Sequence, residues 1–129
     1  MNFKSKKTEE RSQYMNALLY GIMLEMVKWI EDRSHHATIT ETVTTPMEDK
    51  RLKRKSATHN QGRAFDLRTW DLPDDLVRNL IKHFDELFGH LGAVSSTTGK
   101  TNLIVWHNAG TGKHLHVQLN PSYAMNIAI

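Results

Sequence analysis

Four side chains that can bind a metal lie in two short stretches of the sequence. His59 and Asp66 are seven residues apart, and His114 and His116 follow nearly fifty residues later. Zinc binds imidazole nitrogen and carboxylate oxygen at roughly 2.0 to 2.2 Å, and a catalytic zinc site uses three protein ligands and leaves the fourth position to water. His59, Asp66 and one histidine of the second stretch would supply that set. We therefore expect a metal site.

The composition limits the number of domains and the kinds of ligand. A chain of 129 residues with 39% hydrophobic residues can form one core, so we expect a single domain over residues 1–129. The sequence contains no cysteine, which leaves His, Asp and Glu to hold any metal. No apolar run approaches the ~20 residues that span a bilayer, and no signal-type apolar segment follows the first lysines. We expect synthesis in the cytoplasm without a signal peptide, and no membrane partner.

Positive charge is concentrated directly before the first histidine stretch. The formal charge of +3 and the pI of about 9.3 favour anionic partners such as cell-wall polymer or nucleic acid. Five lysines and arginines fall within residues 50–55. Such a run is most often a solvated loop, and a basic rim that faces the substrate is the alternative. By position, Arg54, Lys55 and Arg63 are candidates for binding a substrate carboxylate.

Two helices are predicted from apolar residues that repeat with the helical period. The first runs from Thr8, which can cap it, to about residue 33, and the second starts at Pro73 and ends at Gly89. Their apolar positions are Met15, Leu18, Leu19, Ile22, Met23, Met26, Val27 and Ile30 in the first helix and Leu76, Val77, Leu80, Ile81, Phe84, Leu87 and Phe88 in the second. Both helices are expected to pack on the core.

The remaining segments predict strands and one long loop. Residues 37–45 are rich in β-branched side chains and end at a proline, which indicates a strand whose threonine-rich face we expect to be exposed. Residues 46–58 show no periodicity and are predicted to form a long loop, a kind of segment that is often functional. Residues 103–107 and 115–119 predict a hairpin around a Gly-rich turn at 109–112.

Side-chain alternation decides which face of each strand the candidate ligands occupy. In a short strand that buries Phe65 and Leu67, Asp66 turns to the opposite face. In the last strand, His114 and His116 share the face opposite the apolar positions. The expected fold class is therefore α+β, an antiparallel sheet with two packed helices on one side and a metal on the other.

The two stretches resemble motifs of a known family. From His59 the first stretch is His-Asn-Gln-Gly-Arg-Ala-Phe-Asp, which is similar to the His-x-x-Gly-x-Ala-x-Asp motif of the zinc D-alanyl-D-alanine carboxypeptidases. The second resembles the His-x-His motif of the wider superfamily, which groups lysostaphin-type enzymes, D-Ala-D-Ala peptidases and the amino-terminal domain of Sonic hedgehog. The order of helix, motif strand, helix and hairpin is similar over most of the chain. The resemblance implies a Hedgehog/DD-peptidase-like fold and a peptidase that acts on peptidoglycan.

The resemblance also implies a role for each candidate residue. It makes His59, Asp66 and His116 the zinc ligands and leaves His114 as a catalytic histidine. Zinc with an open coordination position polarises a peptide carbonyl and lowers the pKa of a water toward ~7, which prepares that water to attack. A nearby base must then accept the water proton and return it to the leaving amine.

The base is where the sequence departs from the family pattern. Many relatives place an acid a few residues before the last ligand, whereas residues 102–113 contain no Asp or Glu. His107 or His114 must then serve, which is chemically reasonable because imidazole titrates near neutral pH. A second departure is Ala57, where carboxypeptidases of the family often have a serine that helps to bind substrate.

These observations lead to one expected function and two alternatives. The expected function is zinc-dependent hydrolysis of an amide bond involving a D-amino acid in cell-wall peptides, by a phage or prophage endolysin released at lysis or by a virion-associated enzyme. In the first alternative the domain binds zinc but has lost hydrolysis and works as a structural or recognition module. In the second, the basic loop binds nucleic acid and the histidines are incidental. The missing acid favours the first alternative.

Overall fold

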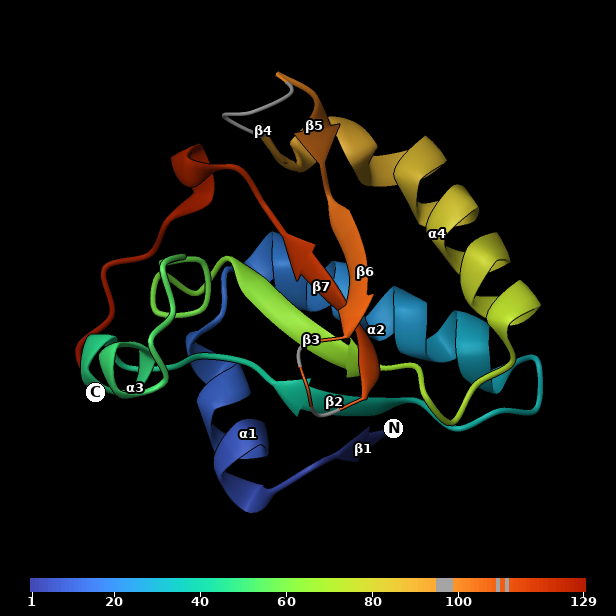
Figure 1. The fold of residues 1–129 in the computed structure, drawn as a ribbon, viewed down its shortest axis with the longest axis horizontal. Coiled ribbons are helices and arrows are strands. Elements are labelled where there is room, and N and C mark those ends of the chain that lie inside the picture. Colours follow the sequence, from blue (N-terminus) through green and yellow to red (C-terminus); the bar gives the residue numbers. More distant parts are fainter. Residues whose placement is uncertain (95–98, 109, 111) are drawn as a thin grey trace.

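In the computed structural model, which describes residues 1–94, 99–108, 110 and 112–129, the chain adopts a mixed α+β fold. A five-stranded sheet with the order β1-β2-β3-β7-β6 lies at its centre (Figure 1). Neighbouring strands are antiparallel except β1 and β2, which are parallel. The strands are Asn2–Phe3 (β1), Thr38–Glu41 (β2), Ala64–Arg68 (β3), Lys113–Gln118 (β7) and Ile104–Asn108 (β6).

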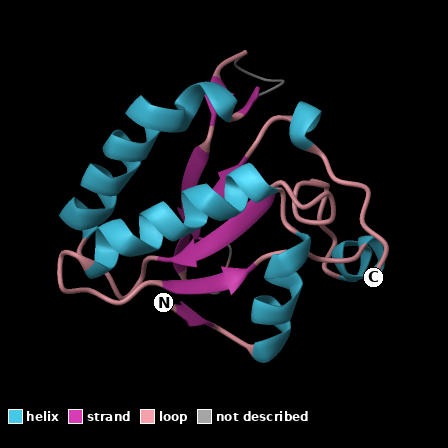
Figure 2. Ribbon diagram, turned by 180° about the vertical axis from the view of Figure 1, so that it is seen from behind, coloured by secondary structure: helices cyan, strands magenta, loops and turns pink. Residues whose placement is uncertain are grey.

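Two long helices cover one face of this sheet. Helices α2 (Ala17–Glu31) and α4 (Asp74–Phe88) lie against it, as the view from behind shows (Figure 2). The large apolar strand side chains with no exposed surface are Ile39, Phe65, Leu67, Leu115 and Val117. A shift of one residue in any strand would move its apolar set to the other face, so this burial fixes the register. The predicted α+β class with a mostly antiparallel sheet is confirmed.

Smaller elements complete the fold. They are α1 (Lys6–Arg11), α3 (Pro46–Arg51), the 3₁₀ turns Ser12–Tyr14, Gly89–Leu91 and Pro121–Tyr123, and the separate pair of strands β4 (Ala93–Val94) and β5 (Thr101–Asn102). In the part of the chain that the structure describes, no helix combines the length and the apolar character needed to cross a membrane.

The first predicted helix is wrong in its extent. Instead of one helix from Thr8, the structure has α1 and α2 with a 3₁₀ turn between them. Ser5 caps α1 by accepting a hydrogen bond from the Thr8 backbone, and Asn16 caps α2 by accepting from the backbone of Leu18 and Leu19. An asparagine in this position satisfies the free N–H groups of a new helix, so the chain starts again there although the apolar spacing continues.

The predictions for residues 37–58 are wrong in two respects. The threonine-rich face is not exposed, because Thr42 and Thr44 are buried and their hydroxyl groups donate to protein oxygens. The predicted loop contains α3, which begins with a capping box between Thr45 and Glu48. Reciprocal hydrogen bonds of this kind stabilise a short helix that has no apolar stripe.

Helix α3 is also joined to α1 by ion pairs. Glu48 pairs with both Lys7 and Arg11. Burial alone would raise the pKa of Glu48, but hydrogen bonds from Lys7, from the Thr45 backbone and from Arg11 lower it to about 2. The carboxylate therefore stays charged at neutral pH and holds the two short helices together.

The second helix and the hairpin agree with the sequence. Helix α4 begins after Pro73 and ends before Gly89. Strands β6 and β7 form the predicted hairpin, with boundaries one or two residues from those expected. Within the predicted turn, Ala109 and Thr111 lie outside the described residues.

Candidate metal centre

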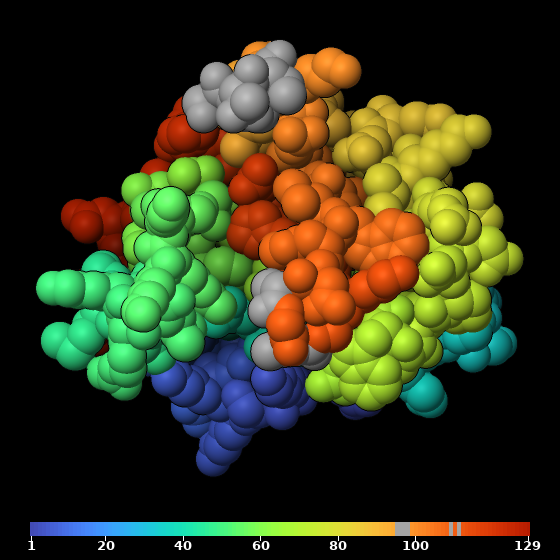
Figure 3. All heavy atoms as spheres, viewed as in Figure 1, coloured from blue at the N-terminus to red at the C-terminus, as the bar shows by residue number. Residues whose placement is uncertain are grey.

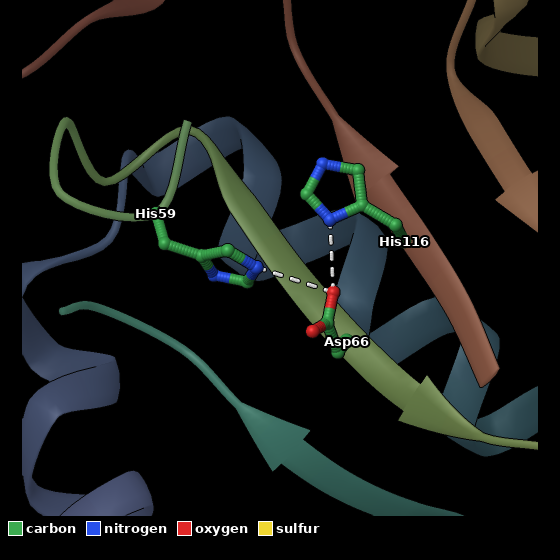
Figure 4. Close-up of side chains that lie close together, drawn as sticks. All are labelled: His59, Asp66 and His116. Carbon is green, nitrogen blue, oxygen red and sulfur yellow. Dashed lines mark hydrogen bonds and ion pairs between the residues drawn. The ribbon is translucent and has the colours of Figure 1, made fainter. Parts of the chain in front are cut away.

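His59, Asp66 and His116 come together on the open face of the sheet (Figure 4). His59 lies in the loop before β3, Asp66 in the middle of β3, and His116 directly opposite Asp66 on β7. Oδ1 of Asp66 is 3.2 Å from Nε2 of His59 and 2.9 Å from Nδ1 of His116. One ligand atom from each residue lies within 4.8 Å of the others, so the group could hold a metal ion.

The hydrogen bonds of His59 decide which of its nitrogens can bind a metal. Nδ1 lies 2.7 Å from the carbonyl oxygen of Thr42, and a carbonyl can only accept, so Nδ1 carries the proton and donates it. In the neutral ring, Nε2 is then an acceptor whose lone pair faces Asp66. A backbone carbonyl in this position is the usual support of a metal-binding histidine.

In His116, as in His59, one ring nitrogen faces a protein oxygen, which here belongs to a side chain. Its Nε2 lies 3.1 Å from Oε1 of Gln118 and 3.3 Å from the hydroxyl of Thr58. The amide nitrogen of Gln118 donates to the carbonyl oxygen of Asn102, which fixes its Oε1 toward the ring. Nε2 of His116 therefore donates, and Nδ1 keeps a lone pair that also faces Asp66.

Three acceptor atoms thus converge on one point, which requires a cation between them. Burial alone would raise the pKa of Asp66, but the charges and hydrogen bonds of His59 and His116 lower it strongly. Burial alone would lower the pKa of His59, but Asp66, Glu41 and the Thr42 carbonyl raise it. A proton fills this position when no metal does, and a divalent metal that accepts nitrogen and oxygen ligands satisfies all three atoms at once.

Backbone contacts that only glycine permits fix the loop that carries His59. Gly62 has a φ of 66°, and a Cβ there would lie 2.9 Å from both the carbonyl oxygen of Tyr14 and Cδ1 of Ile127. The carbonyl oxygen of Gly62 accepts a hydrogen bond of 2.8 Å from the backbone of Asn16. The loop is therefore tied to the start of α2 and to the C-terminal segment.

A buried carboxylate that the sequence analysis did not single out gives the loop a second anchor. Asp49 of α3 is 4% exposed and accepts hydrogen bonds from Thr44, Arg54 and Asn60. Because Asn60 follows His59, this network joins α3 to the loop at the metal centre. The capping box at the start of α3 was the sequence signal that could have revealed it.

Glu41 is the second residue that the sequence analysis missed. It lies on β2 opposite Asp66, and its Oε2 is 3.6 Å from Nε2 of His59. The same oxygen is 2.6 Å from Nη2 of Arg54, although no hydrogen bond of good geometry reaches it. A lone acid at the end of a threonine-rich strand was the only available sequence signal. Glu41 brings a carboxylate to the centre from a strand far from residues 102–113.

The centre lies in a cleft of about 790 Å³ that the other predicted histidines also line. His107 and His114 are paired across β6 and β7, with ring centroids 4.3 Å apart. Burial and the nearby His114 and His116 lower the pKa of His107. Figure 3 shows this face, with the green segment before β3 on one side and the orange hairpin strands on the other.

The three predicted substrate-binding cations are placed differently. Arg54 and Lys55 line the cleft, Arg54 with Glu41 and Asp49 as partners. Arg63 is buried outside the cleft, where its guanidinium donates to Gln61 and to a backbone carbonyl. Arg63 directly precedes Ala64, the first residue of β3, and its hydrogen bonds support the loop. The prediction that Arg63 binds substrate is therefore wrong.

Comparison of the chain with protein-family models, with curated proteins and with solved structures found no match in any of the three.

Asp66→Ala removes the atom on which both histidines converge. We expect affinity for zinc to fall by more than roughly 100-fold, since even the loss of a supporting group beyond the ligands costs 10- to 100-fold. Competition with a chromophoric chelator measures the change. His36→Ala, which alters an exposed histidine after α2, is the control and should bind zinc normally. Unchanged affinity in Asp66→Ala would mean that this carboxylate is not a ligand.

Gly62→Ala should destabilise the protein by roughly 2 kcal/mol or more, because it combines an unfavourable φ with a steric clash against backbone. Urea unfolding of the metal-free protein measures the effect. Gly21→Ala is the matched control: nothing lies within 4 Å of its added Cβ, and alanine favours helix, so stability should rise by up to ~1 kcal/mol. Equal stability of the two variants would contradict the role given to Gly62.

Proposed function

We propose that this chain is a zinc-dependent peptidase, similar to the D-alanyl-D-alanine carboxypeptidases, that hydrolyses an amide bond involving a D-amino acid in peptidoglycan peptides. The observation that carries the proposal is the convergence of Nε2 of His59 and Nδ1 of His116 on Asp66, with the remaining imidazole nitrogens held by protein oxygens. Two histidines and one carboxylate beside an open cleft are a donor set of catalytic zinc. The two motifs that contain these ligands support the family.

The cleft supports this chemistry because it is lined by both apolar and polar side chains, so it can hold a peptide beside the metal centre. Trp70 and Val105 offer apolar surface, and the histidines and charged side chains lie beside them. Zinc bound at the centre would polarise the scissile carbonyl and lower the pKa of the attacking water. A side chain of the cleft must take the proton of that water and deliver it to the amine as the amide C–N bond breaks.

His114 is the residue to which we assign the proton transfer. Its Nδ1 lies 3.3 Å from the carbonyl oxygen of Gly112, which can only accept, so in the neutral ring Nε2 is free to take a proton. It stands on the same face of β7 as His116, two residues away. Glu41 is the alternative base, because it lies near His59. Its Oε2, the oxygen that would accept the proton, already pairs with Arg54.

A zinc-binding module without hydrolytic activity is the second candidate. Both carboxylates at the centre are already engaged, Asp66 by the two histidines and Glu41 by Arg54. This arrangement favours a stable metal site over a reactive one. Nucleic-acid binding has less support, because Arg54 of the basic run is paired with Glu41 and Asp49.

Zinc-loaded protein should shorten the stem peptides of purified peptidoglycan, or open their cross-links, in a reaction that a chelator stops and added zinc restores. Mass spectrometry of the soluble and digested wall fragments gives the bond that is cut. Walls with different cross-bridges are needed, because amide bonds that involve a D-amino acid occur at different places in them. If protein with one bound zinc leaves every wall intact, the non-catalytic module becomes the better account.

His114→Ala should leave zinc bound and reduce hydrolysis by ~10²- to 10⁴-fold, the usual size of general acid–base catalysis. His107→Ala and Glu41→Gln, assayed on the same peptidoglycan, should cause smaller losses. The metal content of each variant separates a catalytic defect from the loss of a ligand. A larger loss in Glu41→Gln would transfer the proton-transfer role to that carboxylate, and loss of zinc in His114→Ala would make His114 a ligand.

A further inference from the structure

Arg68 lies in the cleft next to the metal centre. It ends β3 on the same face as Asp66, two residues away, and pairs in register with His114. Its side chain lines the cleft. Two residues of strand span about 6.6 to 6.8 Å, so Arg68 lies one such step from the metal ligand.

Arg68 is a cation without a counterion among the residues described. The other cleft arginine, Arg54, pairs with Glu41 and Asp49, and Lys113 lies 3.8 Å from Asp74. By contrast, no carboxylate in residues 1–94, 99–108, 110 and 112–129 pairs with Arg68. Its Nε is buried and has no hydrogen-bond partner. The two terminal nitrogens of the guanidinium also have no partner among the described residues and, unlike Nε, are not enclosed by the protein, so an acceptor from outside the chain fits there.

Trp70 holds the guanidinium in place from one side. Cζ of Arg68 lies 4.9 Å from the centroid of the Trp70 ring. The ring itself is seated on Gly112, where an added Cβ would come within 2.6 Å of it. Stacking on an aromatic face leaves the edge of a guanidinium free, and that edge matches a carboxylate with two parallel hydrogen bonds.

We infer that Arg68 binds the free C-terminal carboxylate of the substrate, so that this chain removes a C-terminal residue and does not cut inside a cross-bridge. The inference rests on the proposed function, because it takes the scissile amide to lie at the His59, Asp66 and His116 centre. The residue to be removed, when extended, spans about half of the two-residue strand step from Asp66 to Arg68. The side chain of Arg68 covers the rest of the distance to the carboxylate.

The test compares two peptides that differ only at the C-terminus: diacetyl-L-Lys-D-Ala-D-Ala and its C-terminal amide. The wild-type protein should cleave the acid with a kcat/KM on the order of 10²-fold above that of the amide, because the amide leaves the half-buried charge of Arg68 unpaired. Arg68→Gln should lose that preference by slowing cleavage of the acid, while zinc content and thermal stability stay unchanged. Arg68→Lys should recover part of it, since lysine keeps the charge but not the two-pronged geometry.

Arg51→Gln is the matched control, because it removes an exposed arginine of α3 that does not line the cleft, and it should behave as wild type. An Arg68→Gln variant that keeps the preference for the acid, or that slows both peptides equally, would overturn the inference. So would a wild-type protein that cleaves acid and amide alike.

Calorimetric titration of the same peptides into zinc-loaded protein separates this inference from the proposed function. Tighter binding of the acid than of the amide, lost in Arg68→Gln but without cleavage of either, would overturn the peptidase and keep Arg68 as a carboxylate site. Binding of neither peptide, or equal binding of both, would overturn the carboxylate site even if peptidoglycan is hydrolysed elsewhere.

Discussion

The meeting of two imidazole lone pairs with one carboxylate oxygen is the constraint on which the rest of the site depends. Each lone pair faces Asp66 because the opposite nitrogen of the ring donates to a protein oxygen, Thr42 O for His59 and Gln118 Oε1 for His116. Acceptors this close repel one another unless a cation lies between them. The fold therefore brings together a group that is stable only when it holds a proton or a metal.

Strand β3 connects this group to the hydrophobic core. Phe65 and Leu67 are fully buried under the helices, and Asp66 between them turns to the cleft. Burial of the apolar pair thereby fixes the direction of the carboxylate, and pairing with β7 places His116 opposite it. Only His59 comes from a loop. That loop has anchors of its own, from Gly62 and from the network of Asp49.

Strand alternation explains why much of the centre could be predicted from sequence. The period of two placed Asp66 and His116 on one face without any knowledge of their partners. The break at Asn16 was missed because apolar residues keep the same spacing on both sides of it, so the helical periodicity gave no sign that Asn16 caps a new helix. Glu41 and its pairing with Arg54 were missed for a different reason. Their proximity depends on how β2 pairs with β3 and how α3 returns toward them, and no local pattern encodes such long-range pairing.

The charges of the cleft follow from the same set of pairs. Glu41 and Arg54 neutralise each other, and two neutral histidines with one carboxylate leave a divalent metal with a net charge of about +1. Arg68, Lys4 and Lys55 add positive charge to the lining. A cleft with one sign of charge concentrates ligands of the opposite sign, so under the proposed function the surface around the metal centre would select anionic peptides before any atom of the centre touches them. The free carboxylate of a wall peptide carries that charge at the end of the chain, next to the bond that a carboxypeptidase cuts.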